Sequence, residues 1–276
     1  MSDAPPKDPL WPQVGQSLGP WLILRHHDLE GSGDMFLAKR RDGAFEREVL
    51  ITLQIPTAPG EKDDGVFIAE RELQSRLDHP GIAKVLGAGL TQDGLPYLVT
   101  EFLDGINIEE NLDAIRASVA QRLGAYQQVC HAVQHAHEKG ICGLNLQASN
   151  VHLMPDGNLR IVVFGLALWN RGENDKRATR ASGELSAGPV FAGEYASPEQ
   201  WSSNKPDASS DVYSLGALLY RLLTGSSPHD LQGLTPAQAR TRVQRGSVPR
   251  ASVRAHALEN QLHALRCSST PRALVS

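Results

Sequence analysis

The chain has 276 residues, enough for two lobes or one large core. Its formal charge of −4 argues against a general binder of nucleic-acid backbones, and no apolar run approaches the roughly 18 residues that a membrane-spanning helix needs. The polar, proline-rich N-terminus carries no signal-peptide pattern. The three cysteines lack C-x-x-C spacing, which favours free thiols in a reducing compartment. Composition therefore predicts a cytoplasmic protein that engages neither nucleic acid nor membrane.

The first hundred residues predict a leader followed by a lobe of strands. Residues 1–17 are expected to form a flexible leader, and 18–103 the lobe. Apolar runs bounded by turn residues predict five strands, over 21–24, 35–39, 49–53, 83–88 and 96–102. The spacing of apolar residues predicts one main helix over 67–77.

The remainder, residues 104–276, reads as a mostly helical lobe from about residue 106 onward. A helix is predicted over 119–139, with Gly140 as a suitable C-cap, and a strongly apolar helix over 211–223. Residues 168–191 are polar and irregular between these helices.

A short motif at residues 143–150, GLNLQASN, suggests the class of protein. The catalytic loop of protein kinases reads H-R-D-L-x-x-x-N, with the Asp as base and the Asn on a metal ion. Leu146 and Asn150 hold the matching positions, whereas Asn145 stands where the catalytic aspartate belongs. One degenerate motif is weak evidence. Further segments match kinase motifs in the correct order: 70–80, 97–105, 164–165, 195–199, 211–216 and 222–225.

Over about residues 18–276 the chain thus resembles the bacterial-type (Hanks-type) serine/threonine protein kinases. The resemblance implies an α+β, two-lobed protein kinase-like fold. It has a five-stranded antiparallel N-lobe with one main helix and a mostly helical C-lobe. It also implies that Glu101 and Leu103 belong to the hinge, and that residues 168–191 match an activation segment.

The glycine-rich phosphate loop is degenerate. The resemblance places G-x-G-x-x-G on residues 28–33, where Asp28 and Glu30 replace the first two glycines and Gly33 remains. A carboxylate 4 Å from a phosphate charge costs about 1 kcal/mol in water and about 4 kcal/mol at an effective dielectric of 20. An ordinary acidic turn with solvated side chains is the alternative, since the register of the loop is open.

The lysine of strand V-A-I-K is replaced by Thr52, which cannot neutralise a phosphate. Lys39 could substitute only from about 13 Å along the neighbouring strand, and is otherwise a solvated strand end. Leu50, at the position of the small residue that packs on adenine, adds bulk that could fill the slot.

The base and the metal ligands are degenerate too. The amide of Asn145 cannot act as a general base, a loss that typically costs about 10²–10⁴-fold. Gln147 replaces the lysine that steadies the transferring phosphate, and Val163 replaces the D-F-G aspartate that binds metal. Asn150 remains, but Mg²⁺ is usually held through carboxylates and phosphates, so a structural role is expected for it.

Structural anchors of the family persist. The resemblance implies that Glu199 pairs with Arg272 and that Asp211 holds the backbone of residues 143–145. Two further groups stand apart from these anchors. His131 and His135, at i and i+4, have a spacing that can bind a metal. Four arginines, either a solvated face or a docking surface, are Arg240, Arg242, Arg245 and Arg250.

The sequence therefore predicts a pseudokinase: a catalytically inactive scaffold or allosteric partner of another protein, with ATP and Mg²⁺ binding weak or absent. The alternative is an unorthodox ATP-binding enzyme on the same fold, with Lys39 or a bound metal in a new role. A defective fragment without function is a third possibility.

Overall fold

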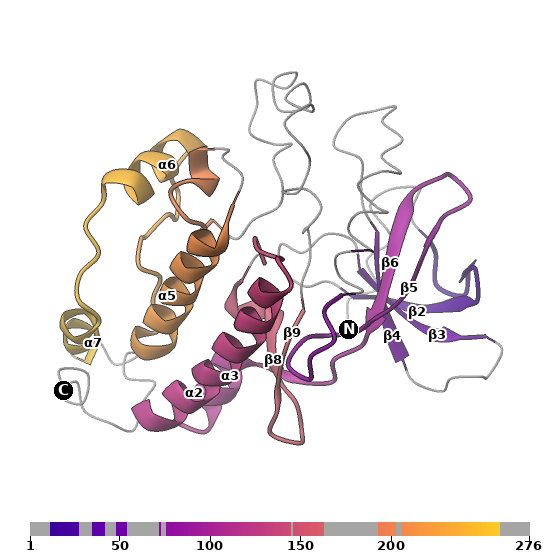
Figure 1. Cartoon of the computed structure of the whole chain (residues 1–276), viewed down its shortest axis with the longest axis horizontal. Helices are drawn as coiled ribbons and strands as arrows, with labels where there is room; N and C mark the ends of the chain where they lie inside the picture. Colours follow the sequence, from indigo (N-terminus) through magenta and orange to yellow (C-terminus); the bar gives the residue numbers. More distant parts are fainter. Residues whose placement is uncertain are drawn as a thin grey trace. The chain divides into compact units, whose positions relative to one another are not determined.

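The computed structural model describes residues 12–27, 35–41, 48–53, 72, 76–144, 146–162, 193–202 and 206–259. They form two compact units. The first contains the described residues before 76 together with Lys84–Phe102, and the second contains Arg76–Ala83 and the described residues from 103 onward. Figure 1 shows the strands of the first unit and the helices of the second.

The first unit is built on an antiparallel sheet in the order β1-β2-β3-β4-β6-β5. Its strands are β1 (Ser17–Leu18), β2 (Trp21–His27), β3 (Met35–Arg40), β4 (Glu48–Leu53), β5 (Val85–Leu90) and β6 (Pro96–Glu101). The five predicted strands are all present, and β1 is an additional strand of two residues. The predicted helix over 67–77 lies outside the described residues except at 72, 76 and 77.

Two residues of the predicted flexible leader, Gly15 and Gln16, form hydrogen bonds with β2. The N–H of Gly15 donates to the carbonyl of Ile23, and the N–H of Ile23 donates to the carbonyl of Gln16, both at 2.9 Å. Residues 15 and 16 are therefore tied to β2 before the first strand pair begins.

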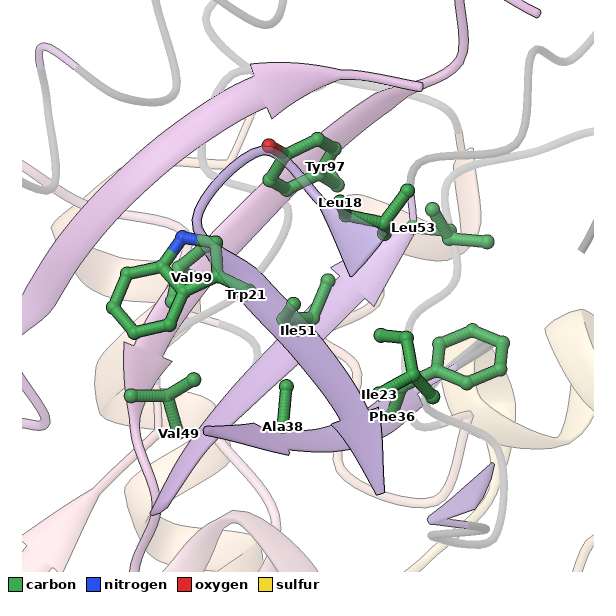
Figure 2. Packing of buried hydrophobic residues seen from close by; sticks show 10 residues of the cluster. All are labelled: Leu18, Trp21, Ile23, Phe36, Ala38, Val49, Ile51, Leu53, Tyr97 and Val99. Atoms are coloured by element: carbon green, nitrogen blue, oxygen red, sulfur yellow. The ribbon is translucent and has the colours of Figure 1, made fainter. Parts of the chain in front are cut away.

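Alternate residues of the strands build a hydrophobic core on one face of the sheet (Figure 2). Its members are all buried: Leu18, Trp21, Ile23, Phe36, Ala38, Val49, Ile51, Leu53, Tyr97 and Val99. Gly89 on β5 makes room for the ring of Tyr97, because a Cβ built there would lie 2.5 Å from the tyrosine oxygen. The intervening strand residues, such as Leu50, Thr52 and Thr100, lie on the opposite face.

The second unit is mostly helical, as predicted. Its helices are α2 (Ile108–Ala114), α3 (Val119–Glu138), α5 (Ala208–Thr224), α6 (Pro236–Arg245) and α7 (Ala251–Glu259). A capping box between Ser118 and Gln121 starts α3, which ends at Lys139 before Gly140 with φ +71°, so the predicted helix and its glycine stop are confirmed. Asp207 caps the start of α5, and Gly225 ends it with φ +73°.

This mostly helical unit also contains a small sheet that the sequence analysis did not predict. A small antiparallel sheet joins β7 (Ile106–Asn107), β8 (Val151–Leu153) and β9 (Leu159–Ile161). The 3₁₀ turn η1 (Ala148–Asn150) contacts β7, and another, η4 (Gln200–Ser202), contacts α6. Strands of two or three residues are too short to show a period-two pattern, so the sequence carries no signal for them.

Arg122 on α3 is the largest fully buried side chain among the described residues, with 0% exposure. Its guanidinium donates to the carbonyls of Leu222 at 2.9 Å and Leu112 at 3.2 Å, and to Asp113 Oδ1 at 2.8 Å. It also donates to the carbonyl of Ala117 at 3.3 Å. One side chain thereby joins α2, α3 and α5.

Candidate functional site

The loop at residues 143–150 is held from α5. Asp211 accepts hydrogen bonds from the N–H of Gly143 at 2.9 Å and of Leu144 at 2.8 Å. His137 Nε2 on α3 lies 2.9 Å from the same carboxylate. Gly143 has φ +79°, a conformation that favours glycine. The predicted anchoring role of Asp211 is confirmed at 143 and 144, whereas Asn145 lies outside the described residues.

Asn150 and Gln147 lie on the same turn. Asn150 is 2% exposed; its N–H donates to the carbonyl of Gln147 at 3.1 Å, and its own carbonyl accepts from Val162 at 2.8 Å. The structural role expected of Asn150 stays a prediction. Gln147 is half-buried at the N-cap of η1, where its side chain makes no capping bond.

Thr52 lies on the sheet face opposite the core of Figure 2, together with Leu50. Its side chain is 8% exposed, and among the described residues its hydroxyl has no hydrogen-bond partner. Thr100 on β6 repeats this pattern, 2% exposed with a hydroxyl likewise unpartnered there, and lies directly opposite Leu50 in the register. This part of the sheet is therefore an apolar, enclosed surface with two neutral hydroxyls.

Lys39 lies on the same face of the sheet but at its margin. It is exposed, and the register places it opposite Glu48, whereas Met35 stands opposite Thr52. Lys39 is therefore four residues along β3 from the position opposite Thr52, a backbone separation of about 13 Å.

The two hinge residues have different surroundings. Glu101 accepts the N–H of Lys84 at 2.9 Å, which ties the end of β6 to the segment before β5. Leu103 is buried in a cluster of the second unit with Ala83 and Val162, against which Met154 packs. Neither Val162 nor Met154 was singled out from the sequence.

His152 on β8 is a further residue that sequence reasoning missed. It is 9% exposed, and its Nδ1 lies 3.4 Å from the carbonyl of Gly105. Burial lowers the pKa of this histidine, against smaller opposing effects of hydrogen bonds to Gly105 and Ser149. A Cβ on Gly105 would lie 2.8 Å from the carbonyl of Leu153, so the chain after Leu103 packs tightly on β8.

Glu194 belongs to an ionic network that the sequence did not reveal. Arg221 on α5 pairs with Glu109 at 2.9 Å and with Glu194 at 3.3 Å, and Ser227 also donates to Glu194. Next to it, burial raises the pKa of the Tyr195 hydroxyl to about 12. Glu194 is thus held to α5 by an ion pair.

The remaining predicted positions fall outside the described residues: Asp28, Glu30, Gly33, Val163 and Arg272. The partner of Glu199 that the structure describes is Ser210, whose hydroxyl donates to it at 2.8 Å.

A third histidine, His79, lies beside the pair His131 and His135 of α3. The ring of His79 lies 5.0 Å from that of His135, and burial, followed by His135 and His131, lowers the pKa of His79. Across the described ranges no group of three or more His, Cys, Asp or Glu is arranged to hold a metal. The contact therefore packs residues 76–83 on α3. No helix within the described residues is long and apolar enough to cross a membrane.

The Asp211 anchor, the loop with Asn150, and the strand order match one class of protein. A profile of the protein kinase domain matches residues 52–265, and the chain belongs to that family. The match begins at Thr52, after residues 28–33, where the phosphate loop was predicted.

Bacterial serine/threonine kinases are among its relatives. The chain is 31% identical over 240 residues to a probable serine/threonine-protein kinase PknB of Corynebacterium glutamicum, covering 83% of this chain and 36% of that protein. It is 34% identical over 201 residues to the DNA damage-responsive serine/threonine-protein kinase RqkA of Deinococcus radiodurans, covering 72% and 29%. The chain thus spans about a third of the length of these relatives.

The fold has a solved counterpart. The kinase domain of Mycobacterium tuberculosis PknI, crystallised as a single-residue mutant, superposes with a TM-score of 0.61 at 20% identity, covering 90% of this chain and 86% of that one. The predicted protein kinase fold, with its antiparallel N-lobe sheet and helical C-lobe, is confirmed.

Proposed function

We propose that this protein is a pseudokinase, a member of the protein kinase family that performs no phosphoryl transfer and acts by binding another protein. Its membership in the family supplies the scaffold. It differs from an active member in the residues that stand at the catalytic positions of that scaffold.

The observation that carries the proposal is the burial of Thr52 at the position of the family's lysine. Phosphoryl transfer in this family needs a lysine cation on this strand. Thr52 is instead buried on a sheet face with Leu50 and Thr100, and its hydroxyl is unpartnered among the described residues. An enclosed apolar surface penalises a nearby phosphate charge, because ions lose hydration there without compensation.

Residues elsewhere in the chain support the same conclusion. Asn145 and Val163 stand at the positions of the base and the principal metal ligand, and neither side chain can do that chemistry. The remaining candidate ligand, Asn150, is 2% exposed. The family's lysine, base and metal ligand are therefore replaced together, and Lys39 lies too far along β3 to replace the first.

The test combines a transfer assay with a binding assay on the 276-residue chain. We expect no incorporation of labelled phosphate from ATP into the chain itself or into myelin basic protein, with Mg²⁺ or with Mn²⁺. A working bacterial serine/threonine kinase, assayed alongside, is the positive control. Metal-dependent transfer that disappears in the Asn150→Ala variant would overturn the proposal.

Nucleotide binding is measured separately by thermal shift. A ligand at a hundred times its Kd stabilises a protein by about 2.7 kcal/mol, which is about 5–11 °C for a domain of this size. We expect no shift at millimolar ATP, with or without metal. A shift without transfer would leave the protein inactive but would refute the inference that the surface around Thr52 excludes nucleotides.

A further inference from the structure

The stretch from α6 into α7 is rich in arginine and holds no acidic residue before Glu259. Residues 231–258 contain five arginines and no Asp or Glu, in a chain whose total charge is −4. The arginines are Arg240, Arg242, Arg245, Arg250 and Arg254. A uniform mixture of signs, the ordinary pattern of a solvated surface, is interrupted here.

Within the part of the chain that the structure describes, none of these five guanidinium groups has an ion-pair partner. Arg240, Arg242, Arg245 and Arg250 are exposed, and the ion pairs of the described residues include none of them. The Nε of Arg254 is buried without a hydrogen-bond partner in the same residues. Elsewhere in the same unit, Arg122 and Arg221 are engaged with carboxylates.

Two pairs of these arginines are neighbours along the chain. Arg242 and Arg245 are three residues apart on α6, so their side chains are neighbours on its surface. The side chain of Arg242 also lies over His229: a Cβ on Gly246 would be 3.2 Å from both Arg242 Cδ and His229 Nδ1. Arg250 and Arg254 stand one helical turn apart at the start of α7, an arrangement of like charges that costs stability without a counter-charge.

Apolar side chains accompany the arginines. Leu234, Val248 and Val253 are 37%, 43% and 58% exposed, so three of the exposed large hydrophobic residues fall within this stretch. Figure 1 shows α6 and α7, in yellow, joined by an extended connection. The Cα atoms of Arg245 and Arg250 can be at most about 18 Å apart, a span that a few residues of an extended peptide can follow.

We infer that the surface formed by residues 234–254 is a docking site for an extended acidic peptide segment of a partner protein, one that carries aliphatic side chains between its carboxylates. Guanidinium groups pair bidentately with carboxylates, and the exposed aliphatic residues provide the apolar contacts that a nucleic-acid backbone lacks. This inference rests on the proposed function, since it names the kind of partner that an inactive kinase domain binds.

The test uses fluorescence anisotropy with a labelled peptide of alternating Glu and Leu. The paired variants are R242Q/R245Q in the surface and R116Q/K139Q outside it, where both side chains are exposed. We expect R242Q/R245Q to bind about fivefold more weakly, the effect of losing two exposed ion pairs, and R116Q/K139Q to bind like the wild type. Binding should also weaken as salt is added, and a Gln-Leu peptide should not bind.

Three results would overturn the inference: no binding of the acidic peptide, equal weakening by both variants, or tighter binding of a single-stranded oligonucleotide than of the peptide. Circular dichroism checks that both variants keep their helices. The phosphate-transfer assay on the same samples separates the two proposals. Transfer rejects the proposed function whatever the peptide does, whereas failed peptide binding without transfer rejects only this surface.

Discussion

Replacing Arg122 by methionine should destabilise the helical unit strongly. The substitution keeps an unbranched side chain but removes the guanidinium and its four donor contacts, one of them to Asp113. Removing one partner of a buried ion pair costs about 3–5 kcal/mol. Two features reduce that figure: Asp113 is 24% exposed and can regain water, and the Leu112 carbonyl keeps the N–H of Ala117.

We therefore expect the free energy of unfolding to fall by about 3–4 kcal/mol, which lowers Tm by about 6–16 °C. Urea titration followed by circular dichroism measures the change, because α2, α3, α5, α6 and α7 lie in the unit that contains Arg122. The matched control is Arg116→Met on an exposed side chain, expected to change stability by less than about 0.5 kcal/mol. A loss below about 1 kcal/mol in Arg122→Met would refute the reasoning, since the guanidinium would then be replaceable by an apolar chain.

Three further changes test the description of the sheet and of residue 195. Thr52→Val should leave the free energy of unfolding in urea unchanged or raise it by up to about 1 kcal/mol, because it removes a buried hydroxyl that is unpartnered among the described residues. A clear fall in that free energy would mean that the hydroxyl has a partner. Gly89→Ala should lower the free energy of unfolding by about 1–3 kcal/mol, because its Cβ meets the Tyr97 ring. The control Gly124→Ala, on α3 with nothing within 4 Å of its Cβ, should raise it by up to about 1 kcal/mol. Equal effects of the two variants would contradict the predicted clash. The pKa of Tyr195 is raised from 10.0 to about 12, so its contribution to stability is complete below pH 10 and is lost as the pH rises through 12. The stability of Tyr195→Phe should fall less over that interval, and parallel pH curves would argue against the raised pKa.

The order of motifs was enough to predict the fold, because each segment carried its own local signal. The caps of α3 and the apolar run of α5 are readable in the sequence, and the strands β2 to β6 follow apolar runs between turns. The strands β1, β7, β8 and β9 were missed, since two or three residues cannot display a period.

The contacts of charged residues were harder to predict than the elements. Arg122 reads in the sequence as an ordinary polar position of a helix, yet it is fully buried, because its partners come from residues 10 and 100 positions away. Arg221 is similar, with Glu109 and Glu194 arriving from distant segments. Thr52 was recognised by its place in a motif, whereas its burial and the surroundings of its hydroxyl depend on the packing of the whole sheet.

The way in which Asp211 holds residues 143 and 144 has a consequence for how such a protein can change. The carboxylate contacts main-chain N–H groups, which every amino acid except proline provides. At 144 the hydrogen bond itself makes no demand on the side chain, which is buried, and at 143 the positive φ favours glycine without requiring a reactive group. Shape and reactivity in this loop are separate properties, so a lineage can discard the reactive groups one substitution at a time while the loop keeps its path.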